Sequence, residues 1–210
     1  MNFALCIFAA LGCTNSQISV ELSADEQETI LKAHNDLRSS IAKGTYNVSG
    51  TIKPTAANMR KLKWDPKLAT SAQEWATYCP KENDISILGE NIYMSLSMES
   101  RTIEELISNA TKLWEKEFQD NGWPTTTMEE SGFTSAIRHA TQMAWAETGL
   151  IGCSVGRCGT DYYTKEHLAT LVCHYGEPGN YVGSDIYVEG DTCSACSDGF
   201  RCETDSGLCV

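Results

Sequence analysis

The cysteines limit what this chain can fold into more than any other feature of its sequence. Ten of the 210 residues are cysteine, and seven of these lie between Cys153 and Cys209. Cytosolic proteins rarely carry so many, so the pattern indicates disulfides formed in an oxidising compartment. Zinc is the alternative, since His167 and His174 lie near cysteines, but zinc ribbons usually pair two close Cys-x-x-Cys units.

The cysteine spacing predicts one long bridge and one compact tail. Cys79 stands alone in its half of the chain, so a bridge from it must reach the second half and close a long loop. The stretch from Cys193 to Cys209, CSACSDGFRCETDSGLC, holds four cysteines and has no apolar periodicity. It is too small to fold by burial alone, and we expect two disulfides to hold it.

Residues 1–13 are typical of a signal peptide. MNFALCIFAALG is apolar, is too short to cross a bilayer as a helix and ends in small residues. It carries no Lys or Arg, which leaves a degenerate membrane anchor as the alternative. Removing Cys6 and Cys13 would leave eight cysteines, an even number that suits full pairing. No other segment is apolar enough for a membrane span, so we expect a secreted, extracellular protein.

The composition predicts one globular domain with a small appendage. The formal net charge is −12, which argues against nucleic acid and anionic membrane surfaces as partners because both are negative. A basic partner is compatible with this charge.

Local signals predict three helices that begin at recognisable caps. Ser23 with Glu26, and Thr102 with Glu105, have capping-box spacing, and Asp65 before Pro66 is an N-cap followed by a first-turn proline. A fourth helical pattern runs from about residue 134 to 145. Short strands are expected near residues 89–95, and the segments GLIGCSVGRC and HLATLVCHYG are expected to form an antiparallel pair.

Three polar residues are candidates for a functional site. His139, in RHATQMAW, falls on the inward face of its helix, although a lone inward histidine is more often a hydrogen-bonded core residue. Glu117 falls on the buried stripe of the third helix and needs a partner or a route to solvent. Glu90 follows Gly89 at a turn, where a solvated loop residue is the commoner outcome. His34 is interpreted as a structural core histidine.

Two glycosylation sequons suit a secreted protein. Asn47 begins NVS in a polar loop, and Asn109 begins NAT on the outer face of the third helix.

The motifs together resemble one family. AHNDLR, AANMRKLKWDPKLATSAQEWA, LGENIYMS, LWEKEF, RHATQMAW and LVCHYGEPGN occur in the order of the CAP superfamily, which includes cysteine-rich secretory proteins, antigen 5 and plant pathogenesis-related proteins of class 1. The resemblance covers residues 22–187. It implies an α/β fold, a three-layer α-β-α sandwich with a small antiparallel sheet. The tail at 188–210 resembles the hinge of activation-associated secreted proteins (SCP/TAPS) of parasitic nematodes.

The resemblance also implies which residues line the family's central cleft. Carried over residue by residue, they are Glu90, Glu117 and His139, while Asn83 stands where the family has its first histidine. Arg138 and Ala140 also depart from the usual residues beside the cleft histidine. One imidazole with two carboxylates favours Mg²⁺, Ca²⁺ or Mn²⁺ over Zn²⁺, so we expect at most a weakly bound divalent cation and no required cofactor.

The family implies two disulfide pairings, and the tail pairing is a guess. The four expected pairs are Cys79 with Cys158, Cys153 with Cys173, Cys193 with Cys202, and Cys196 with Cys209.

Three functions follow from the resemblance. The favoured one is a secreted, non-enzymatic effector, with a host-interaction or immunomodulatory role, that binds host proteins or receptors through its surface and cleft. The second is binding and export of a sterol or lipid, for which no residue can be named. The third is a metal-dependent hydrolase or protease at Glu90, Glu117 and His139, and Asn83 counts against it.

Overall fold

The computed structural model describes residues 18–81, 88–129 and 136–210. The expected signal peptide and Asn83 therefore lie outside the described residues.

The centre of the domain is a twisted sheet. In the described residues its strands run in the order β1-β6-β7-β5, all antiparallel, and β4 pairs with β6 in parallel. Two short hairpins, β2–β3 and β8–β9, lie outside this sheet. The strands are β1 (Ile18–Val20), β2 (Asn47–Val48), β3 (Thr51–Ile52), β4 (Lys63–Trp64), β5 (Gly89–Ser97), β6 (Leu150–Thr160), β7 (His167–Gly176), β8 (Cys202–Glu203) and β9 (Leu208–Cys209).

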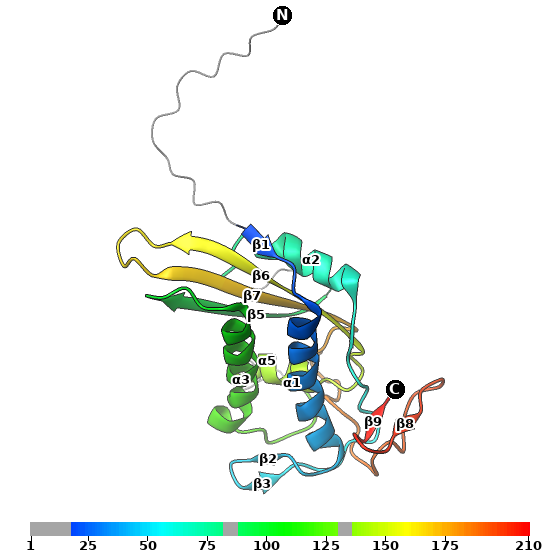
Figure 1. Cartoon of the computed structure of the whole chain (residues 1–210). Helices are drawn as coiled ribbons and strands as arrows, with labels where there is room; N and C mark the ends of the chain where they lie inside the picture. The colour runs from blue at the N-terminus through cyan, green and yellow to red at the C-terminus, as the bar shows by residue number, and fades with distance from the viewer. Residues whose placement is uncertain (1–17, 82–87, 130–135) are drawn as a thin grey trace, which may run out of the picture.

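Helices cover both faces of the sheet and confirm the expected α-β-α sandwich. Figure 1 shows α2 on one face and α1, α3 and α5 on the other. The main core lies between the sheet and these three helices, and a smaller cluster lies under α2. The helices are α1 (Ala24–Ala42), α2 (Pro66–Ala76), α3 (Ile103–Asn121) and α5 (Arg138–Ala144).

The predicted caps define where three of the helices begin. Both capping boxes are present: the Ser23 hydroxyl accepts from the Glu26 N–H in α1, and Thr102 accepts from Glu105 in α3. The Asp65 carboxylate accepts from the first free N–H groups of α2. These side chains bond to donors that a helix cannot satisfy within itself, which is why short-range patterns located the starts correctly.

Small residues let α2 approach the sheet closely. A Cβ built on Gly152 of β6 would lie 2.1 Å from the main-chain nitrogen of Ala69, and one on Gly156 would lie 2.3 Å from the Ala76 carbonyl oxygen. Only glycine fits at these two places, because the contacting atoms are helix backbone.

Arg38 fixes the segment that follows α5. Its side chain is completely buried, and its guanidinium donates only to main-chain carbonyls. Burial lowers the pKa of Arg38 to about 9, so it stays charged at neutral pH. The acceptors are the carbonyls of Arg60, Met143, Trp145, Ala146 and Thr148.

Four disulfides join the described cysteines, with sequence separations from 9 to 79 residues. The first ties the end of α2 to β6, and the second joins neighbouring residues of β6 and β7. They pair Cys79 with Cys158, Cys153 with Cys173, Cys193 with Cys202, and Cys196 with Cys209.

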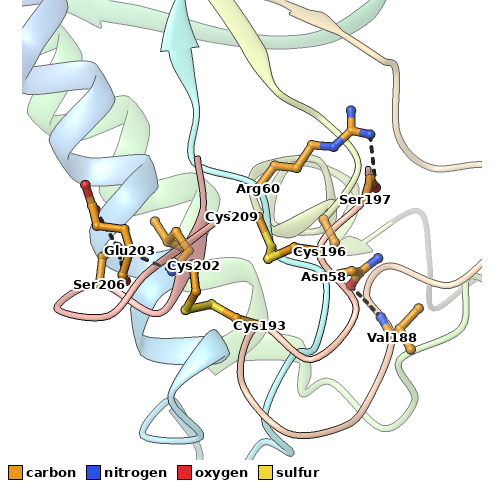
Figure 2. Close-up of a disulfide and its surroundings, with 12 residues drawn as sticks. Asn58, Arg60, Val188, Cys193, Cys196, Ser197, Cys202, Glu203, Ser206 and Cys209 are labelled. Atoms are coloured by element: carbon orange, nitrogen blue, oxygen red, sulfur yellow. Dashed lines mark hydrogen bonds between the residues drawn. A yellow bond between two sulfur atoms is a disulfide. The ribbon is translucent and has the colours of Figure 1, made fainter. Parts of the chain in front are cut away.

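The tail packs against the domain, whereas its composition suggested a segment held by disulfides alone. Leu208 is fully buried and belongs to the main core. The Cys209 N–H donates to the Met59 carbonyl, and the Lys61 N–H donates to the Cys209 carbonyl. Figure 2 shows a side-chain contact near this region from Arg60 to Ser197. Burial of one apolar residue and main-chain pairing therefore add to the crosslinks.

Candidate functional site

His139 and Glu117 come together where α5 meets α3. His139 lies in the first turn of α5, and Glu117 lies in the fourth turn of α3. The two side chains are about one fifth exposed. Glu117 Oε1 lies 2.5 Å from His139 Nδ1. Both residues were predicted from the sequence and the family resemblance.

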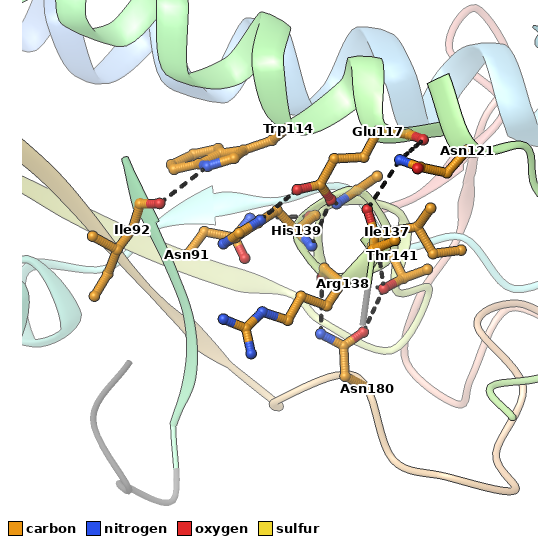
Figure 3. A network of polar contacts seen from close by, with 12 residues as sticks. Asn91, Ile92, Trp114, Glu117, Asn121, Ile137, Arg138, His139, Thr141 and Asn180 are labelled. Carbon is orange, nitrogen blue, oxygen red and sulfur yellow. Dashed lines mark hydrogen bonds and ion pairs between the residues drawn. The ribbon is translucent and has the colours of Figure 1, made fainter. Parts of the chain in front are cut away.

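The Glu117 carboxylate also caps α5. Ile137, at the N-cap of α5, makes no side-chain cap hydrogen bond. Instead, Glu117 Oε2 accepts from the main-chain N–H groups of His139, at 3.0 Å, and Ala140, at 3.1 Å (Figure 3). A carboxylate at this position satisfies donors that the helix leaves free and interacts favourably with its dipole. Both oxygens of Glu117 are thus used within the protein.

These contacts fix the orientation of the His139 ring and the tautomer of its neutral form. Nδ1 donates to the carboxylate when the imidazole is neutral, so Nε2 is then the acceptor. The ring also stacks on Trp114 at a centroid distance of 6.1 Å and an interplanar angle of 19°. Among the described residues Nε2 has no hydrogen-bond partner. The arrangement therefore offers one oriented imidazole nitrogen to a ligand.

A buried polar network also contacts α5 at the His139 carbonyl. The Asn91 amide donates to the His139 carbonyl at 3.0 Å and to the Tyr175 hydroxyl at 3.1 Å. That hydroxyl lies 2.9 Å from His34 Nε2, while His34 Nδ1 lies 2.8 Å from the Ile30 carbonyl. A carbonyl only accepts, so Nδ1 carries the proton and Nε2 accepts from Tyr175. Burial lowers the pKa of His34 to about 4 and raises the pKa of Tyr175.

Asn180 holds the other side of α5. Its amide donates to the Arg138 carbonyl at 2.9 Å, and its oxygen accepts from the Thr141 hydroxyl at 2.6 Å. Figure 3 shows these contacts on the side of α5 opposite Glu117. The first turn of α5 is therefore fixed from three directions.

Glu90 lies on the other face of the sheet. It pairs in register with His174 of β7, and its Oε2 lies 3.1 Å from His174 Nε2. His174 Nδ1 in turn lies 3.1 Å from the Ser71 hydroxyl in α2. Successive strand residues point to opposite faces, and Asn91 points toward His139. Glu90 therefore points toward α2, contrary to the expectation that it joins Glu117 and His139.

The three predicted residues do not form a metal-ligand set. In the part of the chain that the structure describes, the one group of three ligand atoms within 4.8 Å of one another belongs to Cys193, Cys196 and Cys209. Each of these is in a disulfide and cannot offer a thiolate. Glu90, Glu117 and His139 therefore do not form a joint site for the weakly bound divalent cation that the sequence left as a possibility.

Sequence reasoning missed His174, Asn91 and Tyr175 as members of these networks. The sequence around His174 indicates at most a zinc ligand beside the cysteines. The signal that could identify them is the strand register, and this joins residues 84 positions apart.

One sequon asparagine is exposed and the other is half-buried. Asn47 is exposed in β2, where its side-chain oxygen accepts from the Gly50 N–H, and Asn109 is half-buried on α3. Within the described residues no helix is long and apolar enough to cross a membrane.

Comparison with known families agrees with this architecture. The sequence profile of the cysteine-rich secretory protein family, CAP, matches residues 31–175. The chain belongs to this family. The matched region begins within α1 and ends within β7, and it contains Glu117, His139 and Asn91, whereas Asn180 lies beyond it.

Several CAP proteins resemble the chain over most of its length. Venom allergen 5 of Vespula maculifrons is 36% identical over 81% of this chain and 75% of its own length. Ancylostoma secreted protein of Ancylostoma caninum is 34% identical over 87% of this chain and 43% of its own. The crystal structure of NaASP2 with Zn²⁺ has a TM-score of 0.77 at 31% identity, covering 95% of this chain and all of that one.

These homologues are secreted extracellular proteins, and CAP members of this kind are generally non-enzymatic. The chain spans about half the length, or less, of two curated relatives that it matches.

Proposed function

We propose that this chain is a secreted, non-enzymatic CAP protein of the activation-associated secreted group of nematodes. It acts by binding a host protein through its surface, including the site around His139. The similarity to a venom allergen and to an Ancylostoma secreted protein supports this proposal. A disulfide-bridged scaffold with an exposed sequon at Asn47 suits an extracellular binding protein.

The observation that carries the proposal is the complete use of the Glu117 carboxylate. A general base must accept a proton from substrate or water, and a metal ligand must offer a lone pair to the ion. Glu117 instead bonds to two N–H groups and one imidazole of α5. With Glu90 on the opposite face, His139 has no second carboxylate among the described residues with which to share catalysis.

One arrangement favours a second candidate function, hydrolysis by a serine nucleophile. Ser71, His174 and Glu90 stand in the order hydroxyl, imidazole, carboxylate that serine hydrolases use. Ser71 and His174 also line a groove of about 580 Å³. However, Ser71 lies within α2, where the N–H groups of the helix bond to its own carbonyls and cannot form an oxyanion hole.

A serine-reactive fluorophosphonate probe distinguishes the two candidates. We expect the intact protein to remain unlabelled and to leave a peptide library uncleaved. Labelling that disappears in Ser71→Ala but persists in Ser39→Ala would establish a hydrolase instead. Ser39 is a suitable control because its hydroxyl donates to a carbonyl rather than to a histidine.

Binding is tested by affinity capture followed by a direct measurement. The intact protein is expected to capture a host protein that then binds in purified form, saturably and reversibly. Reduced and alkylated protein, which lacks the disulfides, serves as the control for non-specific capture. Failure of every captured protein to bind when purified would contradict the proposal.

A further inference from the structure

A second polar cavity lies at the end of the sheet away from His139. Its volume is about 380 Å³, and its walls include Ser95, Ser100, Arg101, Arg157 and His167. It lies roughly 13 Å along β5 from Asn91, at about 3.3 Å per strand residue. It shares no residue with the contacts that hold His139.

The strand register explains why these side chains meet. Ala169 of β7 pairs with Ser95 of β5 on one side and with Arg157 of β6 on the other. Residues opposite each other in antiparallel strands point to the same face, so Ser95 and Arg157 flank the small Ala169 side chain. His167 lies two residues earlier in β7 and points to the same face. Space for the cavity remains because the residue between Ser95 and Arg157 is an alanine.

Hydrogen-bonding capacity is left over inside the cavity. Ser95 is only 7% exposed, and its hydroxyl has no hydrogen-bond partner among the described residues. Arg157 donates one hydrogen bond, from Nη1 to the Arg101 carbonyl at 2.7 Å, and its other N–H groups have no acceptor in the described part of the chain. Buried polar groups are normally satisfied, so the unpaired hydroxyl of Ser95 indicates a group that enters the cavity from outside, and the part-exposed guanidinium of Arg157 lines the same cavity.

The charge of the cavity is opposite to that of the protein. The chain has a net charge of −12, yet two guanidinium groups line this cavity. Arg101 forms an ion pair with Glu105, whose Oε1 lies 3.5 Å from Arg101 Nη1. Both partners are more than 40% exposed, so this pair neutralises little of the local field. Arg157 makes no salt bridge among the described residues.

We propose that this cavity, formed by Ser95, Ser100, Arg101, Arg157 and His167, binds a single phosphate or sulfate monoester group. Guanidinium groups bind tetrahedral oxyanions through paired N–H donors, and serine hydroxyls donate to the remaining oxygens. A long polyanion is disfavoured because the rest of the molecule repels it. The site is independent of the proposed host-protein binding, and either can fail without the other.

The test is a calorimetric titration of the intact protein at constant ionic strength. The probes are inorganic phosphate, inorganic sulfate, phosphoserine, tyrosine sulfate and glucosamine 6-sulfate, with acetate as a monocarboxylate control. We expect saturable binding of at least one ester and none of acetate. Comparing the phosphate with the sulfate esters identifies the source of the group.

Variants locate the binding. Arg157→Met should weaken binding about tenfold or more, because a charge-assisted donor pair is lost. Arg201→Met makes the same charge change on an exposed tail residue and should leave affinity unchanged. Ser95→Ala, which preserves charge and removes the buried hydroxyl, should also weaken binding and serves if Arg157→Met misfolds.

Three results would overturn the proposal. They are the absence of saturable binding by any ester, equal losses in Arg157→Met and Arg201→Met, and tight binding of a heparin oligosaccharide without binding of any monoester.

Discussion

The carboxylate of Glu117 bonds to two main-chain N–H groups and one imidazole, all within the first turn of α5. Glu117→Gln keeps the shape but removes the negative charge, and its amide nitrogen can face His139 Nδ1 only if the imidazole changes tautomer. Lost charge-assisted bonds and lost helix-dipole interaction should lower the free energy of unfolding by about 2 kcal/mol. Urea unfolding followed by tryptophan fluorescence measures this change.

Glu28→Gln is the matched control, because Glu28 is exposed on α1. Its effect should stay within about 0.5 kcal/mol. Equal unfolding midpoints for the two variants would show that Glu117 does not cap α5.

His34 should make the protein sensitive to mild acid. Burial lowers its pKa from 6.5 to about 4, so the unfolded chain binds more protons than the folded one between these values. The stabilisation is complete above about pH 6.5 and is lost as the pH falls toward 4, by about 3 kcal/mol at most. Urea midpoints measured across this range should show a steeper loss for the wild type than for His34→Gln.

His167→Gln, which removes an exposed histidine, is the matched control for the loss of an imidazole. If His34→Gln and the wild type give parallel profiles, a different group causes the acid sensitivity.

At the scale of secondary structure, the close contact between α2 and β6 depends on Gly152, which has no side chain. The Cβ of Gly152→Ala would lie within 3 Å of three backbone atoms of the α2 region, at Asp65, Leu68 and Ala69. The helix and strand must separate, and overpacking of this kind should cost about 3 kcal/mol. The thermal midpoint reports the loss.

Gly149→Ala is the control for Gly152→Ala. The nearest heavy atom to its added Cβ is a flexible Arg60 carbon 3.7 Å away, so stability should hardly change. Similar losses from both variants would mean that general glycine replacement, rather than the close approach of α2, causes the effect.

The helices were predictable from the sequence because their signals are local. Ser23 with Glu26 and Thr102 with Glu105 act over three residues, so no tertiary information was needed. The position of Glu90 was not predictable in this way. Whether it points to α5 or to α2 depends on a strand register that pairs it with His174, far along the chain. Helical periodicity and the family resemblance both indicated Glu117 and His139; the resemblance grouped Glu90 with them, whereas the structure pairs Glu90 with His174.

At the scale of the whole molecule, the end of the tail is part of the domain, because Leu208 packs into the main core. Its composition suggested a separate disulfide-held segment, yet Leu208 and Cys209 are buried and Cys209 pairs with the backbone around Arg60. Hydrophobic burial by two residues was invisible in the sequence, because a single Leu in a polar tail has no periodic partner.

The two tail disulfides should therefore contribute unequally. They close loops of similar length, with separations of 13 residues for Cys196–Cys209 and 9 for Cys193–Cys202, so the chain-entropy contributions should be nearly equal, at about 3 kcal/mol each. Cys209 is buried beside Leu208, whereas Cys202 is exposed.

Replacing Cys196 and Cys209 with alanine should thus lower the thermal midpoint of the whole domain more than replacing Cys193 and Cys202. Thermal unfolding followed by near-ultraviolet circular dichroism, which reports the core aromatics, measures both. If neither double variant shifts the aromatic signal while hydrogen exchange of the tail increases, the tail unfolds by itself, and its packing on the backbone from Met59 to Lys61 does not stabilise the domain.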